Sequence, residues 1–188
     1  MTQSEFPVVR ELTGFAAENV FERLADKPHC LFLDSALRDS ELGRYSFVAA
    51  DPYEVIQCDA VSAGARIRAS LSKLSSSINR ALPPFQGGVA GVMTYEFGHA
   101  FESLPRARFD EFGLPAVSVG VYDVVVAFDH DQNKAWIISQ GFPESDPARR
   151  RERATSRMAQ VLQWLDEPVQ SERWSTPPDA AISIAAPH

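Results

Sequence analysis

The sequence is poor in the features that mark several protein classes. Only two of its 188 residues are cysteine, Cys30 and Cys58, and their isolated positions give neither a disulfide framework nor a metal-binding spacing. No run of about 18 apolar residues is present, so no transmembrane helix is predicted. The first residues lack a basic region followed by an apolar one, so no secretory signal is predicted. These absences favour a cytoplasmic chain without a membrane partner.

Positive charge is also scarce. Lys and Arg number 18 against 25 Asp and Glu, which gives a net charge of −7. Dedicated nucleic-acid binders are usually basic, so no nucleic-acid partner is expected. The 45% hydrophobic content is typical of a globular chain, and the length fits one domain or part of a larger protein.

Three segments carry apolar residues at helical spacing. The pattern predicts helices over 14–26, with Thr13 as N-cap, and over 63–82, with Ser62 as N-cap. A third helix is expected to begin after Asp146, whose side chain would cap it, and Pro147 suits its first position.

Six segments have the apolar runs or alternation typical of strands: 30–36, 45–52, 54–60, 87–98, 117–129 and 134–141. The last two flank a turn and form the clearest hairpin signal in the chain. Helices surrounding strands that follow one another directly predict an α+β fold with a mostly antiparallel sheet and about three helices.

Three further features have ordinary structural interpretations. The glycines over 87–91 are not followed by a helix, so close backbone packing is favoured over phosphate binding. Asp129, His130 and Asp131 fall in the predicted hairpin turn, where Asp is common, and no metal site is expected. The third helix carries five arginines, which are predicted to form a solvated face: Arg149, Arg150, Arg151, Arg153 and Arg157.

Polar side chains lie where one predicted strand ends and the next begins. A buried strand ends in Asp34 and Ser35, and the next strand begins with Arg44 and Tyr45. If the strands are neighbours, these side chains share one pocket. Its groups could bind the ammonium, the carboxylate and the aromatic ring of an aromatic amino acid. The alternative is an Asp34–Arg44 ion pair that holds the loop, with Tyr45 in the core.

Three blocks give the chain a family resemblance: FLDSA with ELGRYSFVAADP, PPFQGGVAGVMTYEFGHAFESLP, and FGLPAVSVGVYDVVVAFDH. In this order they resemble the N-terminal region of the chorismate-utilising synthases, which include component I of anthranilate synthase and of aminodeoxychorismate synthase. The resemblance implies part of that family's sandwich fold. It also implies an N-terminal domain over 1–168 and a linker over 169–188 that leads to a catalytic domain.

The resemblance also implies that the two halves of the complete enzyme have different roles. In the family the second half binds chorismate and Mg²⁺, and a glutamine amidotransferase subunit supplies ammonia. This chain would hold no catalytic residue, metal or cofactor of its own, and would serve as scaffold and part of the amidotransferase docking surface. Apolar surface that the second half normally covers would be exposed, so self-association is expected.

Family members bind L-tryptophan in this region, where anthranilate synthase has a Leu-Leu-Glu-Ser motif. Asp34 replaces the glutamate here, which favours the aminodeoxychorismate branch of 4-aminobenzoate and folate synthesis. By motif position, the tryptophan-contacting residues include Ser35, Leu42, Gly43, Arg44 and Tyr45. Two alternatives stay open: the regulatory domain of anthranilate synthase component I, and a stand-alone module that binds an aromatic amino acid.

Overall fold

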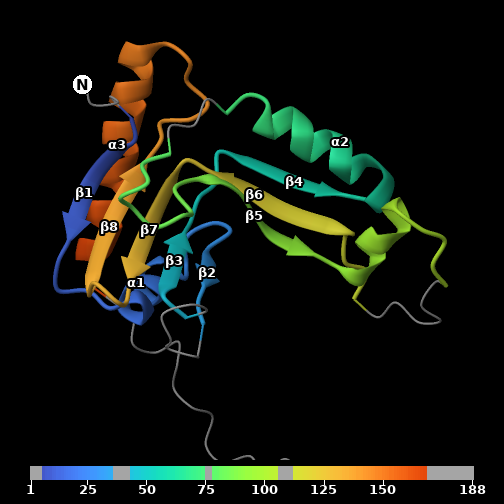
Figure 1. Cartoon of the computed structure of the whole chain (residues 1–188), viewed down its shortest axis with the longest axis horizontal. Coiled ribbons are helices and arrows are strands. Elements are labelled where there is room, and N and C mark those ends of the chain that lie inside the picture. Colours follow the sequence, from blue (N-terminus) through green and yellow to red (C-terminus); the bar gives the residue numbers. More distant parts are fainter. Residues whose placement is uncertain (1–5, 36–42, 75–77, 106–111, 169–188) are drawn as a thin grey trace, which may run out of the picture.

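The structure is a computed structural model that describes residues 6–35, 43–74, 78–105 and 112–168. Its strands form two antiparallel sheets (Figure 1), one of five strands in the order β1-β8-β7-β3-β2 and one of three in the order β4-β6-β5. The strands are β1 (Val8–Leu12), β2 (Leu31–Leu33), β3 (Tyr45–Ala49), β4 (Glu54–Cys58), β5 (Gly88–Met93), β6 (Val117–Tyr122), β7 (Val124–Asp129) and β8 (Lys134–Ser139). The predicted α+β class with antiparallel sheets is confirmed.

Each sheet has one face covered by helices or by a single helix. The five-stranded sheet packs against α1 (Ala17–Leu24) and α3 (Pro147–Asp166), and a core of buried aliphatic residues lies between them. The three-stranded sheet packs against α2 (Ala60–Leu71), and Ile56, Val119 and Val121 are buried there. A 3-10 helix, η1 (Tyr95–Ala100), follows β5 directly and contacts α2. None of the helices in the described residues is long and apolar enough to cross a lipid bilayer.

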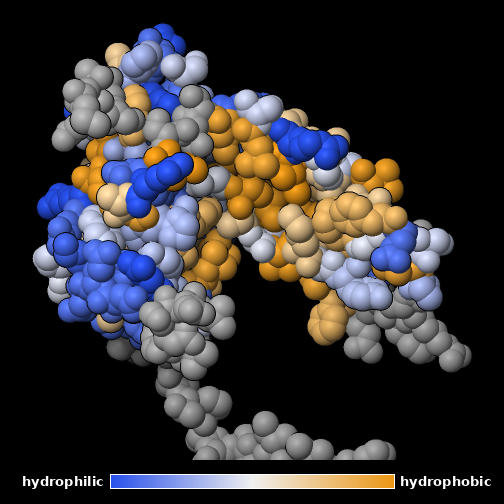
Figure 2. Space-filling view, viewed as in Figure 1, coloured by the Kyte–Doolittle hydropathy of each residue, from blue (hydrophilic) through white to orange (hydrophobic). Residues whose placement is uncertain are grey.

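The two sheets meet at Asp123. The predicted strand over 117–129 is in fact two strands, because β6 belongs to the three-stranded sheet and β7 to the five-stranded sheet. Asp123 separates them, and its side chain is fully buried. From this junction the two sheets diverge, and Figure 2 shows the surface hollowed between them.

The helix boundaries differ from the prediction at two N-termini and at the end of α2, which stops at Leu71 although the sequence pattern predicted a helix as far as residue 82. The cap of α2 is Asp59, not Ser62: its carboxylate accepts hydrogen bonds from the backbone N–H and the hydroxyl of Ser62, at 2.9 and 3.0 Å. The N-cap of α1 is Ala16, not Thr13, and its side chain makes no cap bond. By contrast, Asp146 caps α3 as predicted, accepting from the N–H of Arg149 at 3.0 Å.

The prediction of a solvated arginine face is wrong for three of the five arginines of α3. Arg150 and Arg157 are buried, and Arg153 pairs with Asp123 at 3.1 Å. Arg157 also bonds to Asp123, with Nε and Oδ1 3.1 Å apart. A buried charge needs a charged or hydrogen-bonding partner, and these partners come from segments far from α3 in the sequence, so helical periodicity alone could not reveal them.

Candidate functional site

The strand pair that carries the predicted pocket is present. β2 and β3 pair antiparallel, with Leu31 opposite Ala49 and Leu33 opposite Phe47. This register brings Asp34 and Ser35, which follow β2, to the start of β3. The condition set for a shared pocket, that these two strands are neighbours, is therefore met. Gly43 is buried, and Leu42 lies outside the described residues.

Arg44 has a different partner from the one considered in the sequence. Its guanidinium forms a two-pronged contact with Asp129, with Nε–Oδ1 and Nη2–Oδ2 distances of 3.1 and 2.7 Å, and lies 3.7 Å from Asp131. The cause is the register of β3 with β7, which places Tyr45 opposite Asp129. Burial raises the pKa of Asp129, but the hydrogen bonds from Arg44 and from the N–H of Gln132 outweigh it, so the pKa is lowered.

Arg44 also fixes an aromatic ring. Its Cζ atom lies 4.9 Å from the ring centroid of Tyr45, within the range of a cation–π contact. The Tyr45 ring in turn lies 6.2 Å from that of Phe47. The predicted arginine and tyrosine are thus together, but the donors of the arginine already face two aspartates.

Besides Asp129, two residues that were not among the predicted pocket residues complete this cluster, Ser46 and His130. The hydroxyl of Ser46, which is fully buried, hydrogen-bonds to Asp34 Oδ1 and lies 2.6 Å from Nε2 of His130. The backbone N–H of His130 donates to the carbonyl of Arg44 at 2.8 Å. His130 was assigned to turn chemistry, and only the antiparallel pairing of β3 with β7 shows that the turn returns to this strand end. We call the set Asp34, Ser35, Arg44, Tyr45, Ser46, Asp129 and His130 the strand-end cluster.

A polar cavity of about 490 Å³ lies on one side of this cluster. Its walls are the segment that leads into α1, together with the end of β7 and the β7–β8 turn. Asp129 and His130 line it. Among the described residues, no group of three or more His, Cys, Asp or Glu side chains is placed to hold a metal ion.

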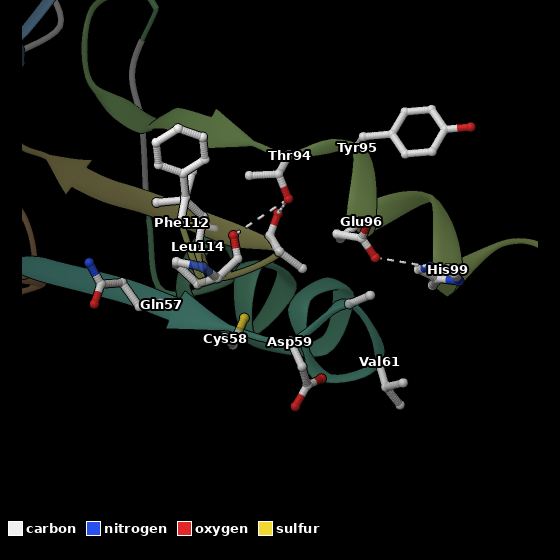
Figure 3. A pocket seen from close by; sticks show the side chains of 13 residues that line it. Gln57, Cys58, Asp59, Val61, Thr94, Tyr95, Glu96, His99, Phe112 and Leu114 are labelled. Carbon is white, nitrogen blue, oxygen red and sulfur yellow. Dashed lines mark hydrogen bonds and ion pairs between the residues drawn. The ribbon is translucent and has the colours of Figure 1, made fainter. Parts of the chain in front are cut away.

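A larger cavity, of about 850 Å³, lies at the far end of the three-stranded sheet (Figure 3). It is formed where the end of β4, the start of α2, the start of η1 and the segment before β6 meet. Its walls are largely apolar, and Phe112 and Leu114 reach into it. Its acidic groups have partners on the chain, because Glu96 lies 3.0 Å from His99 and Asp59 caps α2.

Comparison with known proteins places the chain among chorismate enzymes. Residues 28–185 match the chorismate binding enzyme family. The chain is 30% identical over 161 residues to aminodeoxychorismate synthase component 1 of Escherichia coli K12, covering 70% of this chain and 36% of that protein. It is 29% identical over 185 residues to the Bacillus subtilis protein of the same name, covering 89% of this chain and 37% of that protein.

Anthranilate synthases are similar as well. Anthranilate synthase component 1 of Thermus thermophilus is 29% identical over 139 residues, which cover 68% of this chain and 30% of that protein. The crystal structure of anthranilate synthase component I from Streptococcus pneumoniae TIGR4 has a similar fold, with a TM-score of 0.53 at 21% identity. That match covers 73% of this chain and 33% of the other.

The chain spans about a third of the length of these relatives. The family match itself covers most of the 188 residues, and it agrees with the resemblance carried by the three sequence blocks. The chain therefore belongs to the chorismate binding enzyme family.

Proposed function

We propose that this chain is the N-terminal, non-catalytic part of an aminodeoxychorismate synthase component I. In the complete enzyme, ammonia would add to chorismate and displace the 4-hydroxyl group to give 4-amino-4-deoxychorismate. Mg²⁺ and the residues that hold chorismate would belong to the remaining polypeptide. A glutamine amidotransferase subunit would deliver the ammonia, with this chain forming part of its docking surface.

The observation that carries the proposal is the pattern of coverage. Four aminodeoxychorismate synthase component 1 proteins match 69–89% of this chain, yet the match takes up only 32–37% of each of them. The aspartate at position 34, where the anthranilate motif has glutamate, supports the same branch.

The proposal predicts that the chain alone does not consume chorismate. Incubation with chorismate, Mg²⁺ and ammonium should leave chorismate unchanged by liquid chromatography, while the E. coli component 1 protein under the same conditions supplies the positive control. Turnover by the chain at a substantial fraction of the control rate would contradict a non-catalytic role.

The strand-end cluster is proposed as one wall of a pocket for L-tryptophan or a similar amino acid. The aspartates that surround Arg44 leave its guanidinium little capacity for a ligand carboxylate, so its role in this pocket is to hold the ring of Tyr45. Ser35 and Tyr45 would contact the ligand. The other wall would come from the remaining polypeptide, so the isolated chain should bind weakly.

Calorimetric titration with L-tryptophan tests the pocket. We expect a Kd of about 1 mM, which corresponds to about −4.1 kcal/mol. Ser35→Ala should reduce the affinity several-fold, whereas Ser72→Ala, at the C-cap of α2, should leave it unchanged. Absence of binding at several millimolar ligand, or equal effects of the two substitutions, would contradict the pocket.

A second candidate function rests on the other relatives. Four anthranilate synthase component 1 proteins, one of them described as probable, match at 23–32% identity. In this alternative the chain would be the tryptophan-responsive N-terminal domain of that enzyme. The product distinguishes the two branches: anthranilate formation by an enzyme that contains this chain would favour the alternative.

A further inference from the structure

The outer edge of β5 is exposed and carries nothing that prevents strand pairing. β5 pairs with β6 on one side only. Within the described residues, no backbone hydrogen bond joins its other side to another segment. Gly91, Val92 and Met93 are exposed. In Figure 1 this strand forms the free border of the three-stranded sheet.

The other three edge strands of the described residues have features that block pairing. β1 carries the exposed charged residues Arg10 and Glu11, and β4 begins with Glu54. β2 has only three residues and is followed by Asp34. Proteins commonly protect sheet edges with charges, prolines, bulges or short strands. β5 has six residues, Gly-Val-Ala-Gly-Val-Met, with no charge and no proline.

Exposed apolar side chains gather at the end of this edge. Met93 is 51% exposed and Val92 59%, and the exposed apolar residues near them are Tyr95, Phe101, Phe112 and Leu114. Figure 3 shows Phe112 and Leu114 beside the end of β5, with Tyr95 directed away from the cavity. Aromatic side chains bury about 150–250 Å² each. Tyr95, Phe101 and Phe112 are 76%, 78% and 81% exposed, so these three side chains together expose about 350–600 Å². Stable interfaces bury about 800 Å² per partner, and the strand edge and its aliphatic side chains can supply the difference.

We propose that a second copy of this chain pairs with β5. A two-fold axis perpendicular to the sheet sets β5 antiparallel to its own copy, the direction in which every strand of this sheet already pairs. Such pairing joins the two three-stranded sheets into one continuous sheet and places both copies of α2 on the same face. A two-fold interface uses the same surface on both partners. β5 can meet its own copy in this way because it is uncharged, so no like charges would face each other. This inference stands independently of the proposed function.

Two matched substitutions test the pairing by analytical ultracentrifugation of the 188-residue chain. We expect the wild type to dimerise with a Kd of about 10 µM or tighter. Val92→Lys should raise the Kd at least tenfold, because each copy would bring an ammonium group into the apolar edge. Val9→Lys alters a valine that is 37% exposed on β1, an edge strand of the other sheet, and should leave the Kd unchanged. Circular dichroism establishes that both variants are folded.

Hydrogen exchange of the wild type locates the interface independently of any variant. In the dimer, amides of residues 90–93 should gain protection as concentration rises, while those of β1 should not. A wild type that stays monomeric at about 100 µM, or a dimer that Val92→Lys and Val9→Lys weaken equally, would overturn the proposal. A monomer whose β5 amides become protected only when another polypeptide is added would also overturn it, and would assign the edge to that polypeptide.

Discussion

Asp123→Asn is expected to lower the free energy of unfolding by about 3–5 kcal/mol, the range observed when one partner of a buried ion pair is removed. The Asp123 carboxylate is fully buried at the junction of the two sheets. It accepts hydrogen bonds from Nε of Arg153 and Nε of Arg157, each at 3.1 Å. Asparagine would leave both guanidinium groups facing a neutral amide, and that of Arg157, whose side chain is only 11% exposed, would have little access to water.

The balance of forces at this carboxylate explains why the arginines matter. Burial raises the pKa of Asp123, and Arg157 and Arg153 oppose that shift without reversing it. Arg157 keeps a second partner after the substitution, because its Nη1 lies 2.6 Å from Asp51 Oδ2. Because of this contact, we expect the loss to lie toward the lower end of the range of about 3–5 kcal/mol.

Urea unfolding of the two proteins measures the loss, and a second aspartate provides the control. Asp131 is 44% exposed and lies 3.7 Å from Arg44, so Asp131→Asn should change stability by no more than about 1 kcal/mol. A loss below about 1 kcal/mol for Asp123→Asn would show that the α3 arginines do not depend on this carboxylate.

Local sequence patterns predicted the elements whose stabilising contacts are themselves local. The β7–β8 hairpin depends on a short turn, and the start of α3 depends on Asp146 three residues before the N–H that it caps. β1 was missed because its five residues pair with β8, more than 120 positions later, and its exposed charges conceal the alternation. The sheet change at Asp123 was missed for a similar reason, since the arginines that stabilise a buried aspartate come from a later helix.

In the candidate site, too, only contacts between neighbouring segments of the sequence could be predicted. The meeting of Asp34 and Ser35 with Arg44 and Tyr45 could be anticipated because β2 and β3 are consecutive strands, which pair with each other. The aspartate that binds Arg44 could not be identified, because it depends on the pairing of β3 with β7. Ser46 shows the same limit, since its bond to His130 joins residues 84 positions apart.

The second large effect is expected at Gly91, where close backbone packing was predicted for the glycine-rich segment. Gly91 has a φ of +150°, and a Cβ atom there would lie 2.5 Å from the carbonyl oxygen of Ser118 and 2.7 Å from Cα of Val119. Gly91→Ala should therefore destabilise the chain by about 2–5 kcal/mol, by adding a steric clash to the cost of a positive φ. The same contact holds β5 against β6, so the substitution should loosen the edge of the three-stranded sheet first.

Gly88→Ala, in the same strand, separates the cost of the steric clash from the cost of the positive φ. Gly88 also has a positive φ, +127°, but an added Cβ would have no neighbour within 4 Å. It should therefore incur only the conformational cost, about 1–2 kcal/mol. Urea unfolding gives both losses, and hydrogen exchange of the β6 amides shows whether β5 has separated from its neighbour. Equal losses for the two variants, with unchanged exchange in β6, would mean that the close approach of β5 to Ser118 and Val119 contributes nothing to the stability of this sheet.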